Sequence, residues 1–284
     1  MLYLSKLRGA FVQTKPTFGA NHENIEQAIR LASRVQSDIY VFPELGNTGY
    51  AFKSKNECFD LSESIENGPS VQQFQEFSEK RKCSVVAGLA EKSNGKTYNS
   101  SVVIERGKIL GTYRKMHLFY REKLWFSESQ TGFKVFKLDT LDCKIGVMIC
   151  FDWVFPEVSR ELAILGADVI CHPSNLVLPG KAQIGTLVRA YENKVFIITA
   201  NRVGNENRGP KDKFHFTGRS QIASPQMQKV ANAGATEVVA KVARLDLELS
   251  RDKNATSMNN LMRDRRPEFY RELLGRTSVN QSLQ

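Results

Sequence analysis

Short apolar runs alternate with segments of helical periodicity along most of this 284-residue chain. Residues 7–14, 39–42 and 84–90 are typical of buried strands, and the residues after Asn21 place their apolar side chains on one face at helical spacing. We expect Asn21 to cap that helix. Alternating strands and helices are typical of α/β domains, in which helices cover the faces of a sheet. The pattern therefore places the chain in the α/β class.

The second half of the chain repeats this alternation. Pro156 predicts the start of a helix, and Gly166 predicts its end. Further strands are expected over residues 144–149, 168–171, 195–200, 220–223 and 238–247, with another helix over residues 184–192. No linker rich in Pro, Gly or Ser divides the sequence, so we expect one domain over residues 1–284, with two similar halves whose sheets pack together. A polar tail begins at about residue 251.

The net charge of +10 raises the question of a nucleic-acid partner. The Lys and Arg residues are spread along the chain without an RNP, zinc-finger or helix-turn-helix signature, so we expect no such partner. The sequence has no apolar run long enough to span a bilayer, and its N-terminal residues do not resemble a secretory signal. Five cysteines without a CxxC pair favour reduced thiols. We therefore expect a cytoplasmic protein that binds neither nucleic acid nor membrane.

Cys150 lies where a predicted strand meets a predicted helix. The strand of residues 144–149 runs directly into Cys150, and Pro156 starts the helix that follows. A turn of this kind projects a side chain into a cleft and directs backbone N–H groups and the helix dipole at it. Such surroundings favour a thiolate and bind a developing oxyanion, so a nucleophilic thiol is predicted. From position alone, a buried structural thiol is the alternative.

Glu44 and Lys115 lie at the ends of two other predicted strands. Glu44 follows the apolar run 39–42 and precedes a glycine-rich turn, while Lys115 follows the strand of residues 109–113. A carboxylate beside an apolar strand is suited to proton transfer. Taken singly, Glu44 also fits an N-cap or a surface salt bridge, and Lys115 fits an ordinary surface charge.

Three motifs, in a fixed order, contain these residues. They are Phe42-Pro43-Glu44-Leu45 with Thr48-Gly49-Tyr50, then Arg114-Lys115-Met116-His117-Leu118, then Gly146-Val147-Met148-Ile149-Cys150-Phe151-Asp152 with Phe155-Pro156-Glu157. Two further segments are His172-Pro173-Ser174-Asn175 and Glu192-Asn193-Lys194-Val195-Phe196. On these residues the sequence resembles the nitrilase superfamily of carbon–nitrogen hydrolases from about residue 7 to about residue 270. The likeness is greatest to amidase-type members that act on small aliphatic amides.

The resemblance implies a role for each residue. Cys150 corresponds to the nucleophile, Glu44 to the general base and Lys115 to the cation beside the oxyanion. The backbone N–H of Phe151 is implied as a further oxyanion donor.

Many amidase-type members also carry a second glutamate after the lysine motif. Glu122 is the best match here, and Glu128 is the competing choice. The resemblance further implies a four-layer α-β-β-α sandwich, no metal or organic cofactor, and assembly into a homodimer or larger homo-oligomer. We expect the tail from about residue 251 to take part in the oligomer contacts.

The predicted reaction is hydrolysis of a small, aliphatic amide to a carboxylic acid and ammonia through a thioester on Cys150. Nitrilase members tend to carry Trp then Glu after the nucleophile, whereas Phe151 and Asp152 stand here, which favours an amide over a nitrile. A carbamoyl-group hydrolase stays open as an alternative, and for a substrate carboxylate it needs a cation such as Arg189 or Arg202. An inactive binding or scaffold protein on the same fold is the alternative of another class.

The substrate pocket is expected beside the strand ends. Its candidate lining residues flank or follow the motifs and are Tyr50, Tyr120, Trp153, Asn175 and Val177. Aromatic lining suits a small, partly apolar acyl group.

Overall fold

The computed structural model describes residues 6–209 and 213–275 of the chain. The chain divides into a large compact unit that ends at Asp252 and a smaller unit that starts at Lys253. This boundary lies close to the expected start of the polar tail. The large unit contains two six-stranded sheets and a two-stranded hairpin.

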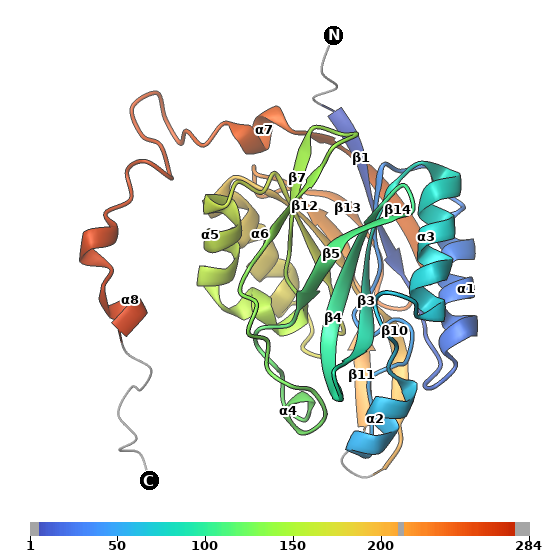
Figure 1. Ribbon diagram of the computed structural model, residues 1–284. Helices are drawn as coiled ribbons and strands as arrows, with labels where there is room; N and C mark the ends of the chain where they lie inside the picture. Colours follow the sequence, from blue (N-terminus) through green and yellow to red (C-terminus); the bar gives the residue numbers. More distant parts are fainter. Residues whose placement is uncertain (1–5, 210–212, 276–284) are drawn as a thin grey trace. The chain divides into compact units, whose positions relative to one another are not determined.

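Six strands form the first sheet. They are β1 (Lys6–Gln13), β2 (Ile39–Val41), β3 (Ser84–Ser93), β4 (Lys96–Glu105), β5 (Lys108–Arg114) and β14 (Val239–Asp246). The sheet has the order β14-β1-β2-β3-β4-β5, with β1, β2 and β3 parallel and the other pairs antiparallel. The helices α1 (Asn21–Ala32) and α3 (Pro69–Arg81) cover its outer face (Figure 1).

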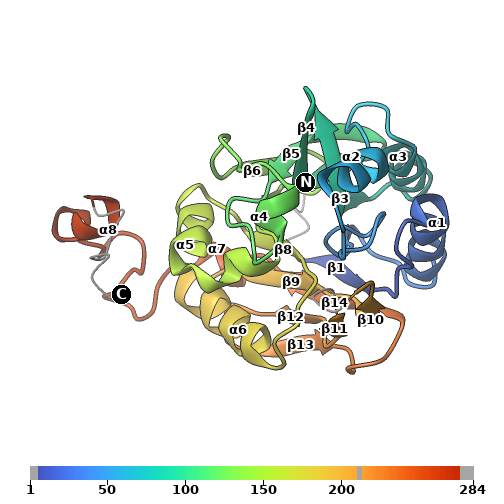
Figure 2. The ribbon, with the colours of Figure 1, turned by 90° about the horizontal axis from the view of Figure 1, so that it is seen from below.

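The second sheet is built in the same way. Its strands are β6 (Val135–Leu138), β7 (Cys143–Val147), β8 (Val169–Pro173), β9 (Phe196–Ala200), β12 (Gln221–Ala223) and β13 (Lys229–Asn232), in the order β13-β12-β9-β8-β7-β6. The helices α5 (Pro156–Ile164) and α6 (Lys181–Asn193) pack on its outer face (Figure 2). Each strand and helix that the sequence predicted by its residue range is found close to the expected bounds.

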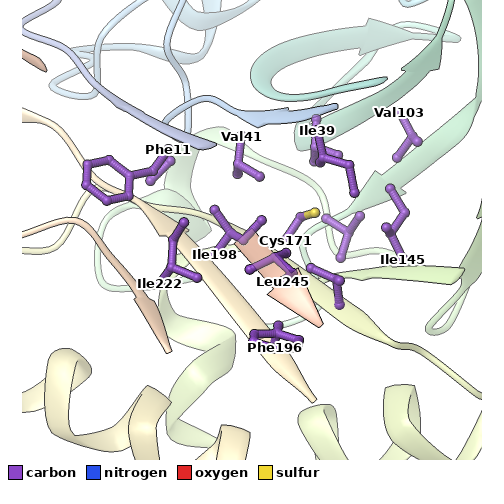
Figure 3. Close-up of a cluster of buried hydrophobic side chains, with 14 of the residues drawn as sticks. Phe11, Ile39, Val41, Val103, Ile145, Cys171, Phe196, Ile198, Ile222 and Leu245 are labelled. Atoms are coloured by element: carbon purple, nitrogen blue, oxygen red, sulfur yellow. The ribbon is translucent and has the colours of Figure 1, made fainter. Parts of the chain in front are cut away.

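The two sheets face each other across a shared core. In β2, Ile39 and Val41 belong to the cluster between the sheets, whereas Tyr40 packs with side chains of α1 and α3. Successive residues of a strand face opposite sides, so this short apolar run fills two cores at once. Figure 3 shows Phe11, Ile39 and Val41 of the first sheet opposite Ile198 of the second. The predicted four-layer α-β-β-α sandwich is confirmed.

Asn21 is the first residue of α1 and does not cap it. Ala20 precedes the helix, and its side chain makes no capping hydrogen bond. The Asn21 amide donates instead to the carbonyl oxygen of Leu61 at 2.8 Å and to Glu63 Oε1 at 3.0 Å. The expected cap was wrong because these tertiary contacts recruit the side chain.

Short elements fill the connections. They are α2 (Lys55–Leu61), α4 (Glu122–Trp125), the 3-10 helix η1 (Cys150–Val154), α7 (Glu248–Arg251) and the hairpin of β10 (Val203–Asn207) and β11 (Lys213–Thr217). The C-terminal unit contains the 3-10 helix η2 (Pro267–Phe269) and α8 (Glu272–Gly275). Over residues 6–209 and 213–275, no helix has the length and apolar character needed to cross a membrane.

Candidate active site

Glu44, Lys115 and Cys150 follow the carboxyl ends of β2, β5 and β7, respectively. Lys115 Nζ lies 2.6 Å from Glu44 Oε1, and the charges of both residues act on the Cys150 thiol. All three side chains are buried. The structure therefore brings together three residues that are far apart in the sequence.

A second glutamate completes this charge cluster. Glu122, in α4, accepts hydrogen bonds from Lys115 Nζ at 2.7 Å and 2.9 Å through its two carboxylate oxygens. Burial raises the pKa of Glu122 to about 7, and the charge of Lys115 opposes that rise. Burial acts to lower the pKa of Lys115, but the charges of Glu122 and Glu44 outweigh it and raise that pKa above its usual value. Glu128 is exposed, so Glu122 is the glutamate that contacts the lysine.

The two carboxylate oxygens of Glu44 have different surroundings. Oε1 accepts hydrogen bonds from Lys115 Nζ at 2.6 Å and from Asn99 Nδ2 at 2.7 Å. Oε2 is buried, and among the residues that the structure describes it has no hydrogen-bond partner. Because buried polar atoms are almost always paired, Oε2 is suited to take a proton from a neighbouring group.

Cys150 is a neutral thiol in a strained backbone conformation. Its φ of 42° lies in the left-handed region, which residues other than glycine rarely adopt. Burial raises the pKa of the thiol well above its usual value, the charge of Glu44 adds to this rise, and the charge of Lys115 opposes it. The sequence predicted surroundings that favour a thiolate, whereas burial is the largest influence on this thiol and favours its neutral form. Cys150 also begins a 3-10 helix of 5 residues and not a long α-helix.

His172 supports the turn at Cys150. Its Nε2 lies 3.0 Å from the carbonyl oxygen of Cys150, and its Nδ1 lies 3.0 Å from Thr199 Oγ1. Since a carbonyl only accepts, Nε2 carries the proton and Nδ1 accepts from the threonine hydroxyl. Burial lowers the pKa of His172 to about 4, which keeps the ring neutral. Sequence reasoning placed His172 in a motif but gave it no role.

A small apolar pocket opens beside Cys150. Its volume is about 40 Å³, and its lining includes Phe119, Phe151, Trp153, Asn175, Val177 and Ala182. Trp153, Asn175 and Val177, three of the predicted lining residues, border this pocket, and their contact with a substrate stays a prediction. Of the described residues, none that lines the pocket is charged.

Asn175 has unused hydrogen-bonding capacity. Its side chain is 3% exposed, yet neither Nδ2 nor Oδ1 has a partner in the described part of the chain. A buried amide without partners is costly unless another group satisfies it. Asn175 is therefore suited to bind a polar group that enters the pocket.

Tyr50 contacts Glu122 and does not line this pocket. Its hydroxyl donates to Glu122 Oε1 at 2.9 Å. Burial, together with the charges of Glu122 and Glu44, raises the pKa of Tyr50 well above its usual value, so the hydroxyl stays a donor. The backbone N–H of Tyr50 donates to Glu206 Oε2 at 3.0 Å, and Glu206 pairs with Arg202 in a buried contact. These contacts hold Tyr50 in place, so it positions Glu122.

The structure does not place three other candidates at the pocket. Tyr120 is 58% exposed and is not among the residues that line the pocket, so its contact with a substrate stays a prediction. Arg189 pairs with Glu192 at 3.0 Å. Because Arg202 is fully buried against Glu206, both of the predicted cations are already engaged by carboxylates.

Comparisons with known proteins agree with this geometry. The sequence model of the family described as "Carbon-nitrogen hydrolase" matches residues 8–253. The chain is 43% identical to a protein of Pyrococcus abyssi named "Nitrilase", over 92% of this chain and 98% of that one. It is 32% identical to an N-carbamoylputrescine amidase of Solanum lycopersicum, over 89% of each chain.

The fold has a close counterpart among solved structures. The crystal structure of a carbon–nitrogen hydrolase from Helicobacter pylori G27 matches with a TM-score of 0.85 at 28% identity, covering 96% of this chain and 100% of that chain. The family match includes every residue of the charge cluster. The chain therefore belongs to the carbon–nitrogen hydrolase family, within the nitrilase superfamily, and is an enzyme that acts on non-peptide C–N bonds.

Proposed function

We propose that the enzyme hydrolyses a small, neutral aliphatic amide to the carboxylic acid and ammonia through a thioester on Cys150. One observation carries the proposal: Lys115 contacts both Glu44 and Glu122 beside an uncharged pocket that Cys150 lines. A nucleophile, a proton acceptor and a buried cation are the groups that acyl transfer needs.

The first step is attack of the Cys150 sulfur on the carbonyl carbon. Because the resting thiol is neutral, its proton must leave while the C–S bond forms. Glu44 Oε2, which lacks a donor within the described residues, accepts this proton. Negative charge develops on the carbonyl oxygen, where the Lys115 ammonium and the Phe151 backbone N–H are the proposed donors.

The second step breaks the C–N bond. Glu44 returns its proton to the amide nitrogen, ammonia leaves, and a thioester remains on Cys150. A water molecule then gives a proton to Glu44 and attacks the thioester carbon. The sulfur leaves and regains that proton, so one amide and one water give one acid and one ammonia.

The lining of the pocket supports a neutral acyl group. No described lining residue is charged, and Arg189 and Arg202 pair with glutamates of their own. A carboxylate-bearing carbamoyl substrate therefore lacks an evident counter-ion. A nitrile is the second candidate, favoured by the 43% identity to the Pyrococcus abyssi protein named nitrilase.

A panel of substrates tests the proposal. Ammonia release is measured with acetamide, propionamide and butyramide, with the matching nitriles, and with N-carbamoyl amines and N-carbamoyl amino acids. We expect the highest kcat/KM for a short amide. Release from nitriles alone, or from carbamoyl compounds alone, overturns the amide assignment while retaining C–N hydrolysis.

Activity is expected to fall as the pH drops through about 7, the raised pKa of Glu122. Below that pH Glu122 is protonated, so it no longer stabilises the charge of Lys115. We assign this fall on the acid side of the pH profile, the acid limb, to Glu122 in its contact with Lys115. We expect Glu122→Gln to remove this acid limb of kcat/KM, whereas Glu128→Gln, at an exposed position, retains it. An acid limb that is unchanged in Glu122→Gln contradicts the assignment.

Tyr50→Phe is expected to lower kcat/KM about tenfold, because the Glu122 carboxylate loses a hydrogen bond of about 1.5 kcal/mol. The acid limb should also move to higher pH, since the charged form of Glu122 loses a donor. Steady-state kinetics across pH measure both effects. Tyr98→Phe, at a ring that packs on Arg114, is the matched control. An acid limb that does not move shows that Tyr50 has no influence on Glu122.

We also propose that the enzyme is a homo-oligomer. Ile184 of α6 is 64% exposed. Tyr191 of α6, Ile164 of α5 and Leu165 at the end of α5 are exposed as well. In the C-terminal unit, Met258 and Phe269 are exposed too, which supports a role of the tail in contacts. Ile184→Lys is expected to shift the enzyme to a smaller species in sedimentation velocity, and Lys181→Gln on the same helix is not. An unchanged distribution for Ile184→Lys excludes this face.

The cysteines support a proposed cytoplasmic location. All five are free and buried. Proteins of oxidising compartments generally use such residues in disulfides. Cell fractionation against compartment markers tests the location.

A further inference from the structure

Trp153 lies between α6 and the pocket beside Cys150. It is in η1, it lines the pocket, and it packs against the cluster between the sheets. Ala182, near the start of α6, lines the same pocket. One turn further along α6 is Gly185. The wall of the pocket on this side therefore depends on how closely the indole approaches the helix.

Gly185 allows an unusually close approach. A Cβ atom at this position would lie 2.3 Å from Trp153 Cζ3 and 2.5 Å from Trp153 Cε3. Both atoms belong to the six-membered ring of the indole, and they are not the end of a flexible chain. Glycine is one of the least favourable residues inside a helix. Its presence here is explained by the space that the indole occupies.

We propose that Gly185 is a specificity-determining residue, because it seats the Trp153 ring against α6 and so sets the room for the acyl group beside Cys150. The inference rests on the proposed function in taking this pocket as the acyl site. Gly185 acts through Trp153 and does not line the pocket itself.

The direction of the effect follows from the packing. With a methyl group at residue 185, the contact with Cζ3 must open from 2.3 Å to an ordinary 3.4 Å or more. The indole cannot move into the inter-sheet core, because protein cores are close-packed. Trp153 is partly exposed, and the open space that it adjoins includes the pocket, whose volume is only about 40 Å³. An alanine at residue 185 therefore pushes the ring toward the space beside Cys150 and narrows it.

A double-mutant cycle tests this inference. Gly185→Ala, Trp153→Leu and the double variant are compared with wild type by kcat/KM for acetamide, propionamide, butyramide and valeramide. For Gly185→Ala we expect the butyramide-to-acetamide ratio to fall about tenfold or more, the effect of about one methylene in a tight pocket. Trp153→Leu should raise the ratio, and in that background Gly185→Ala should have no further effect. The inference is overturned if Gly185→Ala lowers kcat/KM equally for all four amides. It is also overturned if Gly185→Ala lowers the butyramide-to-acetamide ratio as much in the Trp153→Leu background as in wild type.

A second readout separates this inference from the proposed function. Alkylation of Cys150 by 2-chloroacetamides with N-alkyl groups of increasing length is followed by intact mass, with Cys150→Ala as the blank. This rate reports the room beside the sulfur even if no amide is turned over. We expect Gly185→Ala to slow the longer reagents selectively. If wild type hydrolyses no amide but the alkylation series responds, the amide assignment fails and the role of Gly185 stands. If amides are hydrolysed and neither series responds to Gly185→Ala, the role of Gly185 fails alone.

Discussion

Cys150→Ala is expected to abolish amide hydrolysis, with a loss on the order of a million-fold in kcat, the size found when a covalent nucleophile is removed from a hydrolase. The reason is that the thioester cannot form without the sulfur, while the acid–base groups have no other nucleophile to activate. Ammonia release under saturating amide measures the loss. Intact mass after a rapid quench should show an acyl adduct on wild type and none on the variant.

Cys171→Ala is the matched control for this experiment. Cys171 is buried in β8, next to β7, which leads to Cys150, and its side chain belongs to the inter-sheet cluster. The Cys171→Ala substitution should lower the free energy of unfolding, but the acyl adduct on Cys150 should still form. Turnover that persists in Cys150→Ala excludes a thioester on Cys150 and requires a different nucleophile.

Lys115→Met is expected to destabilise the fold by about 3–5 kcal/mol, the cost of leaving a buried charge without its partner. Lys115 is in contact with two buried carboxylates, Glu44 and Glu122, which methionine cannot neutralise. Activity should fall by about a thousand-fold or more, because the proposed oxyanion loses its cation. Urea denaturation and steady-state kinetics measure the two effects separately.

The destabilisation by Lys115→Met should increase with pH. The charge of Lys115 opposes the rise that burial causes in the pKa of Glu122, so without it this pKa lies further above its unfolded value and deprotonation on the alkaline side costs stability. The loss at about pH 8 is therefore expected to exceed that at about pH 6. Lys137→Met is the control, since the ion pair of Lys137 with Asp139 is exposed and should be worth under about 1 kcal/mol. Equal losses at both pH values contradict the presence of two uncompensated carboxylates.

Cys150 and Glu44 were accessible from the sequence because they come just after apolar runs, whereas Glu122 was predicted only through the family resemblance. Residues 39–42 and 144–149 form buried strands, and side chains after such strands are carried to one edge of a sheet. The four-layer sandwich was predicted from the resemblance of three motifs to those of the nitrilase superfamily. Asn175 was found by the same reasoning, at the end of β8.

Other features depend on tertiary contacts that no local pattern reports. The Tyr50 hydroxyl reaches Glu122, 72 residues away, so a residue expected in the pocket supports a carboxylate instead. Arg202 looked available for a substrate but pairs with Glu206. Arg202 and Glu206 are four residues apart, and residues at this spacing in an extended segment face the same side. The spacing was therefore a signal that the two could pair. It was missed since Val203–Asn207 contains Gly and Asn, which are rare in strands, and no strand was predicted there.

The contact between His172 and the Cys150 carbonyl also decides where a neighbouring donor points. The amide that joins Cys150 to Phe151 is a rigid plane in which C=O and N–H are directed oppositely. By fixing the carbonyl oxygen, the imidazole at 3.0 Å prevents this plane from rotating and aims the Phe151 N–H away from His172. A neutral histidine thus orients the backbone group that is proposed to stabilise the developing negative charge.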